Sequence, residues 1–258
     1  MTQADADASL PALVQSLHGD SPRVHVPERW LQGRTAFGGL STALALAAVL
    51  RRWEDLPPLR SAQIAFIAPV TREVTIATEL LRQGRSTSFA QADLSSEGRL
   101  ALRATFVFAQ SRDSEVDLDA DLSQEPPPMG DPIAPPPIAF VHNFESRTTG
   151  EEEPGIARYS RWARLRDRDG VPPLVELLAI ADVLPPAAMM VFPRPGAISS
   201  MSWQVNILSD RPGTEDGWWL VRASAEHAKH GVSTQSMSVR NAAGALVASG
   251  VQSVALFV

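Results

Sequence analysis

The 258-residue chain contains no cysteine, which excludes disulfides, thiol nucleophiles and cysteine-based metal sites. It carries no excess of positive charge. The formal net charge is −6 and the sequence pI is about 5.4, which argues against a nucleic-acid partner held by phosphate neutralisation. No apolar run reaches the roughly 20 residues that span a bilayer, and the first residues lack the basic start and apolar core of a signal peptide. We therefore predict a cytoplasmic protein with no membrane span.

Several catalytic motifs are also missing. The five histidines show no metal-ligand spacing, so the sequence predicts no metal site. It has neither the Gly-x-Ser-x-Gly of a serine hydrolase nor a phosphate-binding loop, and it predicts no cofactor. The composition, 44% hydrophobic and 20% charged residues, is typical of a soluble globular protein. The function must therefore be sought in single polar residues on apolar elements.

The order of elements repeats along the chain. An apolar stretch with helical spacing, residues 37–53, precedes four strand-like runs that end near residue 109. A second apolar stretch, with a central helix predicted over residues 174–181, precedes four more runs that end at Val258. Gly84–Gly98 aligns with Gly231–Gly244, since both segments open with Gly-x-Ser-Thr and end in a glycine turn. We predict a duplicated fold with halves at residues 1–110 and 138–258.

Residues 111–137 join the halves and are first acidic and then rich in proline. This composition is typical of an extended, solvated linker. A ligand for a proline-binding module is the alternative reading. For a solvated linker we expect few buried contacts and little loss of stability on shortening residues 123–137.

The last strand places one polar side chain, Gln252, on an otherwise apolar face. An unpartnered buried amide costs about 1–3 kcal/mol, so Gln252 should have a partner, which a neighbouring backbone group could supply. In the register of the repeat, the apolar Phe106 stands opposite Gln252 in the first half. The polar residue therefore appears in the second half only.

Two further residues draw attention. Asp182 lies within the apolar run LLAIADVLPP, where it either caps a helix or turn or serves as a catalytic group. The repeat places it opposite the region of Ser41. Ser200 lies at the start of the strand SMSWQVNIL, on a face with Ser202 and Gln204, and reads locally as a surface residue.

Four segments resemble the acyl-CoA thioesterase II family, the double-hotdog thioesterases. They are FGGLSTALALAAVL (37–50), SAQIAFIAP (61–69), GRSTSFAQADL (84–94) and ALVASGVQSV (245–254). The resemblance covers nearly the whole chain. It implies an α+β double hotdog, with two antiparallel sheets each wrapped around a central helix. It also implies an acyl-CoA substrate and no cofactor.

The family's catalytic set of aspartate, hydroxyl and glutamine falls on Asp182, Ser200 and Gln252, all in the second half. The family usually has threonine at the position of Ser200, and the neighbouring Ser199 would take this position if the alignment shifted by one residue. The resemblance implies that these groups orient a water for attack on the thioester. Backbone N–H groups at a helix N-terminus would stabilise the oxyanion. The apolar helix and strand faces would form a tunnel for the acyl chain.

Two other functions stay open at this point. A non-catalytic acyl-CoA-binding hotdog protein would keep the pocket without turnover. A hotdog hydratase would need an Asp/His pair in one half, and the sequence shows none that is well placed. The sequence is also compatible with a homo-oligomer, and it does not indicate the length of the acyl chain.

Overall fold

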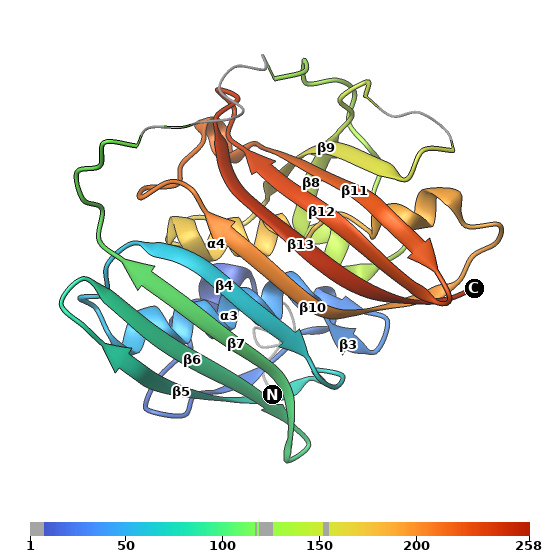
Figure 1. The fold of residues 1–258 in the computed structure, drawn as a ribbon. Coiled ribbons are helices and arrows are strands. Elements are labelled where there is room, and N and C mark those ends of the chain that lie inside the picture. The colour runs from blue at the N-terminus through green and yellow to red at the C-terminus, as the bar shows by residue number, and fades with distance from the viewer. Residues whose placement is uncertain (1–7, 117, 119–125, 152–154) are drawn as a thin grey trace.

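The structure is a computed structural model that describes residues 8–116, 118, 126–151 and 155–258. Within these residues, eleven strands form one antiparallel sheet around two central helices (Figure 1). The strands of the sheet are β1 (Arg23–His25), β4 (Leu59–Phe66), β5 (Glu73–Gln83), β6 (Thr87–Ser96), β7 (Arg99–Ala109), β8 (Phe144–Arg147), β9 (Arg158–Leu165), β10 (Ala197–Ile207), β11 (Trp219–Lys229), β12 (Val232–Arg240) and β13 (Leu246–Phe257). The helices are α2 (Leu10–Gln15), α3 (Gly38–Arg52) and α4 (Pro173–Ala181). The remaining elements are the ribbon β2 (Leu31–Gln32) and β3 (Thr35–Ala36), and the 3-10 turns η1 (Glu28–Trp30), η2 (Ala139–Asn143), η3 (Ala187–Val191) and η4 (Glu215–Gly217).

The sheet is continuous, where the sequence predicted two antiparallel sheets, each around a central helix. Its strand order is β1-β5-β6-β7-β4-β10-β13-β12-β11-β9-β8. The halves meet where β4 pairs with β10, from Ala65 opposite Ser202 to Ser61 opposite Asn206. Each half alone would leave one of these strands as an edge with unpaired N–H and C=O groups. Pairing the two edges satisfies those groups, and this explains why a single sheet forms.

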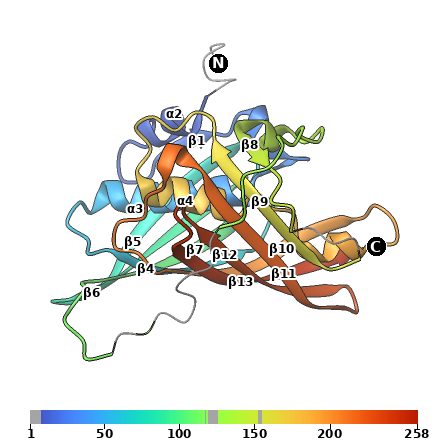
Figure 2. The same cartoon turned by 90° about the horizontal axis from the view of Figure 1, so that it is seen from above.

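Both halves follow the same path, as the repeat predicted. In each half, a helix is followed by four strands, and the first of them lies at the centre of the whole sheet. The last strand lies next to it, so that β7 corresponds to β13 and β6 to β12. The sheet curves around α3 and α4, which lie together on its inner face (Figure 2). Buried apolar residues of both halves form one core between the helices and the sheet.

Helix α3 is buried over most of its length, as its nearly continuous apolar sequence predicted. It ends at Arg51 and Arg52, whose charges complement the negative end of the helix dipole. Helix α4 begins after Pro172 and ends at Asp182, its C-cap residue. The helices approach closely at Gly39, because a Cβ there would lie 2.7 Å from the carbonyl oxygen of Ala179.

Two segments differ from the predicted elements. Residues 138–148, whose sequence is strand-like, form η2 followed by the short β8. In the predicted linker, residues 117 and 119–125 lie outside the described residues. The proline-rich part that follows runs along β8. The Gly130 and Ile133 N–H groups donate to the carbonyls of Thr148 (2.9 Å) and Ser146 (2.8 Å). This part therefore adds to the sheet edge and makes more contacts than a solvated linker would.

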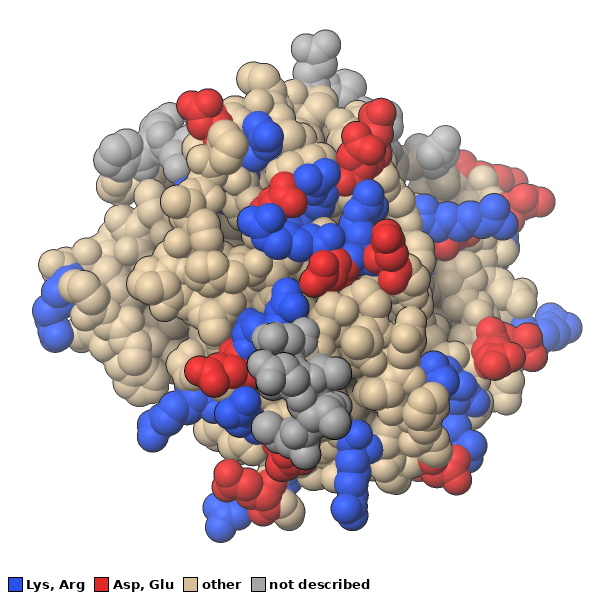
Figure 3. Space-filling model, turned by 180° about the vertical axis from the view of Figure 1, so that it is seen from behind, with Lys and Arg blue, Asp and Glu red and all other residues tan. Residues whose placement is uncertain are grey.

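The described surface carries both signs of charge. On the face in Figure 3, basic and acidic side chains are interspersed between wide uncharged areas. The ion pairs of the described residues include Arg164 with Glu145 and Arg222 with Glu151. In the described part of the chain, no helix is long and apolar enough to cross a membrane.

Candidate active site

A chain of hydrogen bonds, buried at the glutamines, links two glutamines to Asp182. Gln252 on β13 donates from Nε2 to Asp182 Oδ1 over 3.0 Å. Its Oε1 accepts from Gln235 Nε2 on β12 over 2.7 Å. Gln235 Oε1 in turn accepts from the backbone N–H of Ala187 in η3 over 2.8 Å. The glutamines are 3% and 1% exposed, so this network satisfies two amides that would be costly to bury alone.

Asp182 follows the last turn of α4 and faces a cavity. Burial raises the pKa of its carboxyl group from the ordinary 3.8 to about 7. Hydrogen bonds from Gln252 and from the backbone N–H of Gly39 act against this rise because they stabilise the carboxylate. A group with a pKa near neutrality exchanges protons readily at physiological pH, as a general base requires.

The donor from Gly39 brings the first half of the chain into the site. Gly39 lies in the first turn of α3, where backbone N–H groups have no carbonyl partner within the helix. The adjacent Gly38 has no side chain to keep the carboxylate away, since a Cβ there would lie 2.6 Å from Asp182 Oδ2. The positive end of the 15-residue α3 therefore faces the carboxylate.

Ser200 reaches the same cavity through an irregularity in β10. Between Ser200 and Ser202 the register with β13 shifts by one residue, which marks a β-bulge. Because of this bulge, Ser200 and Trp203 both lie opposite buried residues of β13, Val254 and Gln252. Without the bulge, residues three apart would face opposite sides of the sheet. Ser199 also lines the cavity but is exposed and pairs with Ala255.

The cavity has a volume of about 310 Å³ and draws its walls from both halves. Its apolar wall includes Phe37, Val70, Leu184, Ile198 and the rings of Phe66 and Phe140. Its polar groups are Gln32, Thr35, Ser41, Asp182, Ser199, Ser200 and Gln252. The rest of α3 packs into the core, so the predicted tunnel along that helix is replaced by a pocket at its N-terminus.

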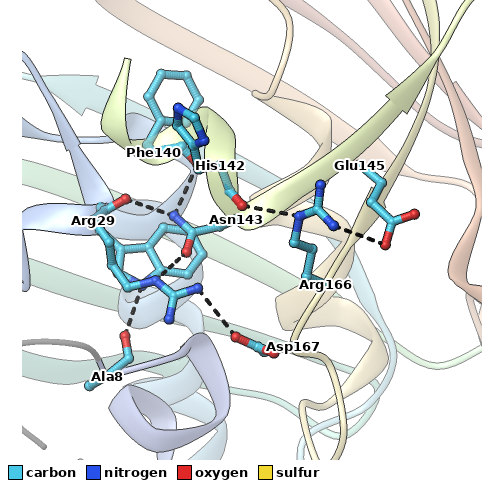
Figure 4. Close-up of polar contacts among 9 residues, drawn as sticks. Ala8, Arg29, Phe140, His142, Asn143, Glu145, Arg166 and Asp167 are labelled. Carbon is cyan, nitrogen blue, oxygen red and sulfur yellow. Dashed lines mark hydrogen bonds and ion pairs between the residues drawn. The ribbon is translucent and has the colours of Figure 1, made fainter. Parts of the chain in front are cut away.

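One wall of the cavity is held by contacts between the halves, shown in Figure 4. The buried Asn143 donates from Nδ2 to the carbonyl oxygens of Arg29 (2.8 Å) and Phe140 (3.0 Å), and Arg29 Nε donates to Asn143 Oδ1 over 2.6 Å. Phe140 stacks on Phe37 with ring centroids 4.2 Å apart. This clasp of Arg29, Phe140 and Asn143 fixes an aromatic wall built from both halves.

The structure thus brings all three residues named from the sequence, Asp182, Ser200 and Gln252, to one cavity. Their catalytic roles stay predictions. Sequence reasoning missed Gln235, which lies on the inward face of β12 together with Ser233 and Met237. It also aligned Asp182 with the region of Ser41, whereas Ser41 lies in the first turn of α3 and Asp182 follows the last turn of α4.

In the described residues, no group of three or more histidine, aspartate or glutamate side chains is placed to hold a metal ion. The candidate site therefore consists of a carboxylate, amides, hydroxyls and backbone N–H groups.

Solved structures define the class of fold. A protein of unknown function with a hot dog fold from Alicyclobacillus acidocaldarius is 26% identical, with a TM-score of 0.82 over 100% of this chain and 99% of that one. A putative thioesterase II from Thermobifida fusca is 20% identical, with a TM-score of 0.79 over 93% of each chain. A TesB protein from Mycobacterium avium subsp. paratuberculosis is 21% identical, with a TM-score of 0.76 over 96% and 99%. The fold is a hotdog fold.

Sequence profiles then identify the family. The profile of the acyl-CoA thioesterase N-terminal domain matches residues 26–109, and that of the C-terminal domain matches residues 119–256. The chain therefore belongs to the acyl-CoA thioesterase family and is a thioester hydrolase, which confirms the resemblance drawn from the sequence. No curated protein matches the chain.

Proposed function

We propose that this protein hydrolyses acyl-CoA thioesters through a water molecule activated by Asp182. The observation that supports this most directly is a carboxylate with a pKa of about 7, held by Gln252 and by the N-terminus of α3 in a cavity with an apolar wall. In this reaction the water oxygen bonds to the thioester carbon while its proton moves to Asp182. The carbon–sulfur bond then breaks, and the proton passes to the departing thiolate of coenzyme A.

Each polar group has a separate role in this proposal. Asp182 is the general base. Gln252 orients its carboxylate, because the amide N–H is hydrogen-bonded to Oδ1. The Ser200 hydroxyl, which lines the same cavity, both donates and accepts and would hold the water in line with the carbonyl carbon.

The first turn of α3 supplies the second part of the mechanism. As the thioester carbon becomes tetrahedral, negative charge develops on its oxygen, and a backbone N–H at a helix N-terminus stabilises that charge. Gly38 lines the cavity and has no side chain to obstruct the approach of the carbonyl. We assign this role to the N–H groups at the start of α3, beside the one that holds Asp182.

The apolar wall of the cavity suits the acyl group. Phe37, Phe66 and Phe140 border the same space as Asp182, so an acyl chain packed on these rings would bring its carbonyl to the carboxylate. The volume of the cavity favours substrates whose acyl group fits at the end of α3 rather than one threaded along the helix.

A panel of acyl-CoAs of increasing length, with thiol release measured colorimetrically, tests the proposal. We expect Asp182→Asn to lower kcat by about 10²–10⁴-fold while KM changes little, because the variant keeps the shape and loses the base. Glu176→Gln is the matched control: this buried carboxylate on α4 accepts from Trp219 Nε1 and is not part of the cavity lining. It should keep the parent kcat.

Two outcomes would contradict the proposal. If Asp182→Asn hydrolyses acyl-CoA at the parent rate, the base is assigned to the wrong residue. If the parent releases thiol from no member of the panel but binds acyl-CoA, the non-catalytic binding function replaces hydrolysis for these substrates.

A further inference from the structure

Gln235 lies behind the candidate site and does not line the cavity. It is 1% exposed and stands directly opposite Gln252 in the pairing of β12 with β13. At the equivalent pairing of β6 with β7, Ala90 stands opposite Phe106, and both are fully buried. The first half therefore builds this layer from apolar residues, whereas the second half places two amides there.

The direction of the hydrogen-bond chain follows from its fixed end. The backbone N–H of Ala187 can only donate, so the atom of Gln235 that faces it must be the amide oxygen. The NH2 group of Gln235 then faces Gln252, whose oxygen must receive it. The NH2 group of Gln252 is left for Asp182. This direction does not depend on how the oxygen and nitrogen of the two amides are assigned, because a backbone N–H cannot accept a hydrogen bond.

This direction matters to Asp182. A glutamine amide can rotate by half a turn, and the rotated form would present its oxygen to the carboxylate. Two acceptors face to face repel unless one of them binds a proton, and a protonated Asp182 cannot act as a base. Some group must therefore keep the NH2 of Gln252 turned toward Asp182.

We propose that Gln235 is the positioning residue that fixes the amide of Gln252 in the orientation required for catalysis, with the Ala187 N–H as its anchor. The inference rests on the proposed function of Asp182 and adds a residue to it. Gln235 acts through Gln252 and does not touch the substrate. A merely structural role would be to tie η3 to the sheet.

A double-mutant cycle separates the two roles. Gln235→Met keeps the length of the side chain and removes its donor and acceptor. We expect it to lower kcat about 10–50-fold and to leave KM within about twofold, because binding groups in the cavity are unchanged. In the background of Gln252→Ala, the same change should have no further effect on kcat, because the amide it orients is gone. Effects that multiply instead would overturn the proposal.

A second readout is the pH dependence of kcat/KM. Without Gln235, the N–H of Gln252 stabilises the Asp182 carboxylate less, so the midpoint of the profile should move to higher pH. Met237→Ala is a matched control, two residues along β12 on the same buried face. It should lower the melting temperature without moving the midpoint. A midpoint that Gln235→Met also leaves unmoved would contradict the positioning role.

Two additions keep the experiment decisive. If Gln235→Met does not fold, Gln235→Glu takes its place in the cycle, since its carboxylate still accepts from Ala187 but cannot donate to Gln252 when ionised. Asp182→Asn is measured in the same series. If Asp182→Asn is inactive and the cycle is additive, only the role of Gln235 is wrong. If Asp182→Asn is fully active, the proposed function itself fails.

Discussion

The two halves of the molecule share one topology but differ at the ends of their helices. Helix α3 begins with Gly38 and Gly39, which offer backbone N–H groups without side chains. Helix α4 has Pro172 as its N-cap and Pro173 as its first residue, and neither has an N–H. The difference continues in the sheet, where Gln235 and Gln252 replace an apolar pair. The first half thus contributes the Gly39 N–H to the candidate site, and the second half contributes the Asp182 carboxylate and the Gln252 amide.

The largest effect we expect comes from Phe106→Gln, which removes the difference between the halves in the sheet. It gives the first half an amide at the position that corresponds to Gln252. Phe106 is fully buried between Ala62 and Ala90, which have no side-chain polar atoms to pair with it. The lost packing and the buried amide should lower the free energy of unfolding by about 3 kcal/mol, measured by urea denaturation.

Thr105→Gln, on the outer face of the same strand, is the control for that change and should stay within about 0.5 kcal/mol of the parent. The kcat of folded Phe106→Gln should match the parent. An unchanged free energy of unfolding in Phe106→Gln would show that β7 accepts an amide as readily as β13 does.

A smaller effect should follow from Gly38→Ala, which gives α3 a side chain at its N-terminus. The new Cβ would lie 2.6 Å from Asp182 Oδ2 and 3.2 Å from the Phe66 ring, so the carboxylate must move. We expect kcat to fall by about 10–100-fold, because a shift of about 1 Å in a reacting group has effects of this order. Gly213→Ala, whose Cβ would meet nothing within 4 Å, should retain the parent kcat. Equal rates for the two variants would remove Gly38 from the site.

The smallest effect concerns stability against pH and tests the environment of Asp182. Folding raises the pKa of this carboxyl group to about 7, so the folded protein binds its proton more tightly than the unfolded chain does. The tighter binding of this proton stabilises the folded state. This contribution is complete below about pH 4 and is lost as the pH rises toward 7. The melting temperature of the parent relative to Asp182→Asn should therefore fall between about pH 4 and pH 7 and stay level above that range. Because the side chain is partly exposed to the cavity, we expect the free energy of unfolding to change by only about 1–2 kcal/mol over this range. A difference that rises with pH would show that the pKa is lowered instead.

The sequence predicted those parts of the fold and site that depend on apolar runs and on single polar residues within them. Gln252 and Asp182 stood out because each interrupts an apolar pattern. The apolar runs also predicted the bounds of the two helices, over residues 37–53 and 174–181, close to those observed for α3 and α4. Ser200 looked like a surface residue, since a β-bulge that turns it inward leaves no mark in an alternating pattern. Gln235 was missed because serines and threonine surround it in VSTQSMSVR, where one more polar residue is unremarked.

Contacts between distant segments were beyond local reasoning. The pairing of β4 with β10, the donor from Gly39 to Asp182 and the clasp of Arg29, Phe140 and Asn143 all join residues from different halves. No periodicity in either partner indicates such a contact. The sequence therefore predicted two sheets where one continuous sheet forms, and it did not indicate which groups of the first half reach the cavity.

The central pairing of β4 with β10 also has a consequence for how the chain is made. During synthesis the first half emerges first and carries β4 as an open edge until β10 follows and closes it. An open edge strand recruits other strands, including those of neighbouring copies. Ser61 of β4 is partly exposed and Gln63 is exposed, and the charge of Arg60 near the start of the strand opposes stacking of identical chains. Before β10 pairs with it, β4 is therefore the strand at which aggregation is most readily started. A separately produced first half would be prone to aggregate.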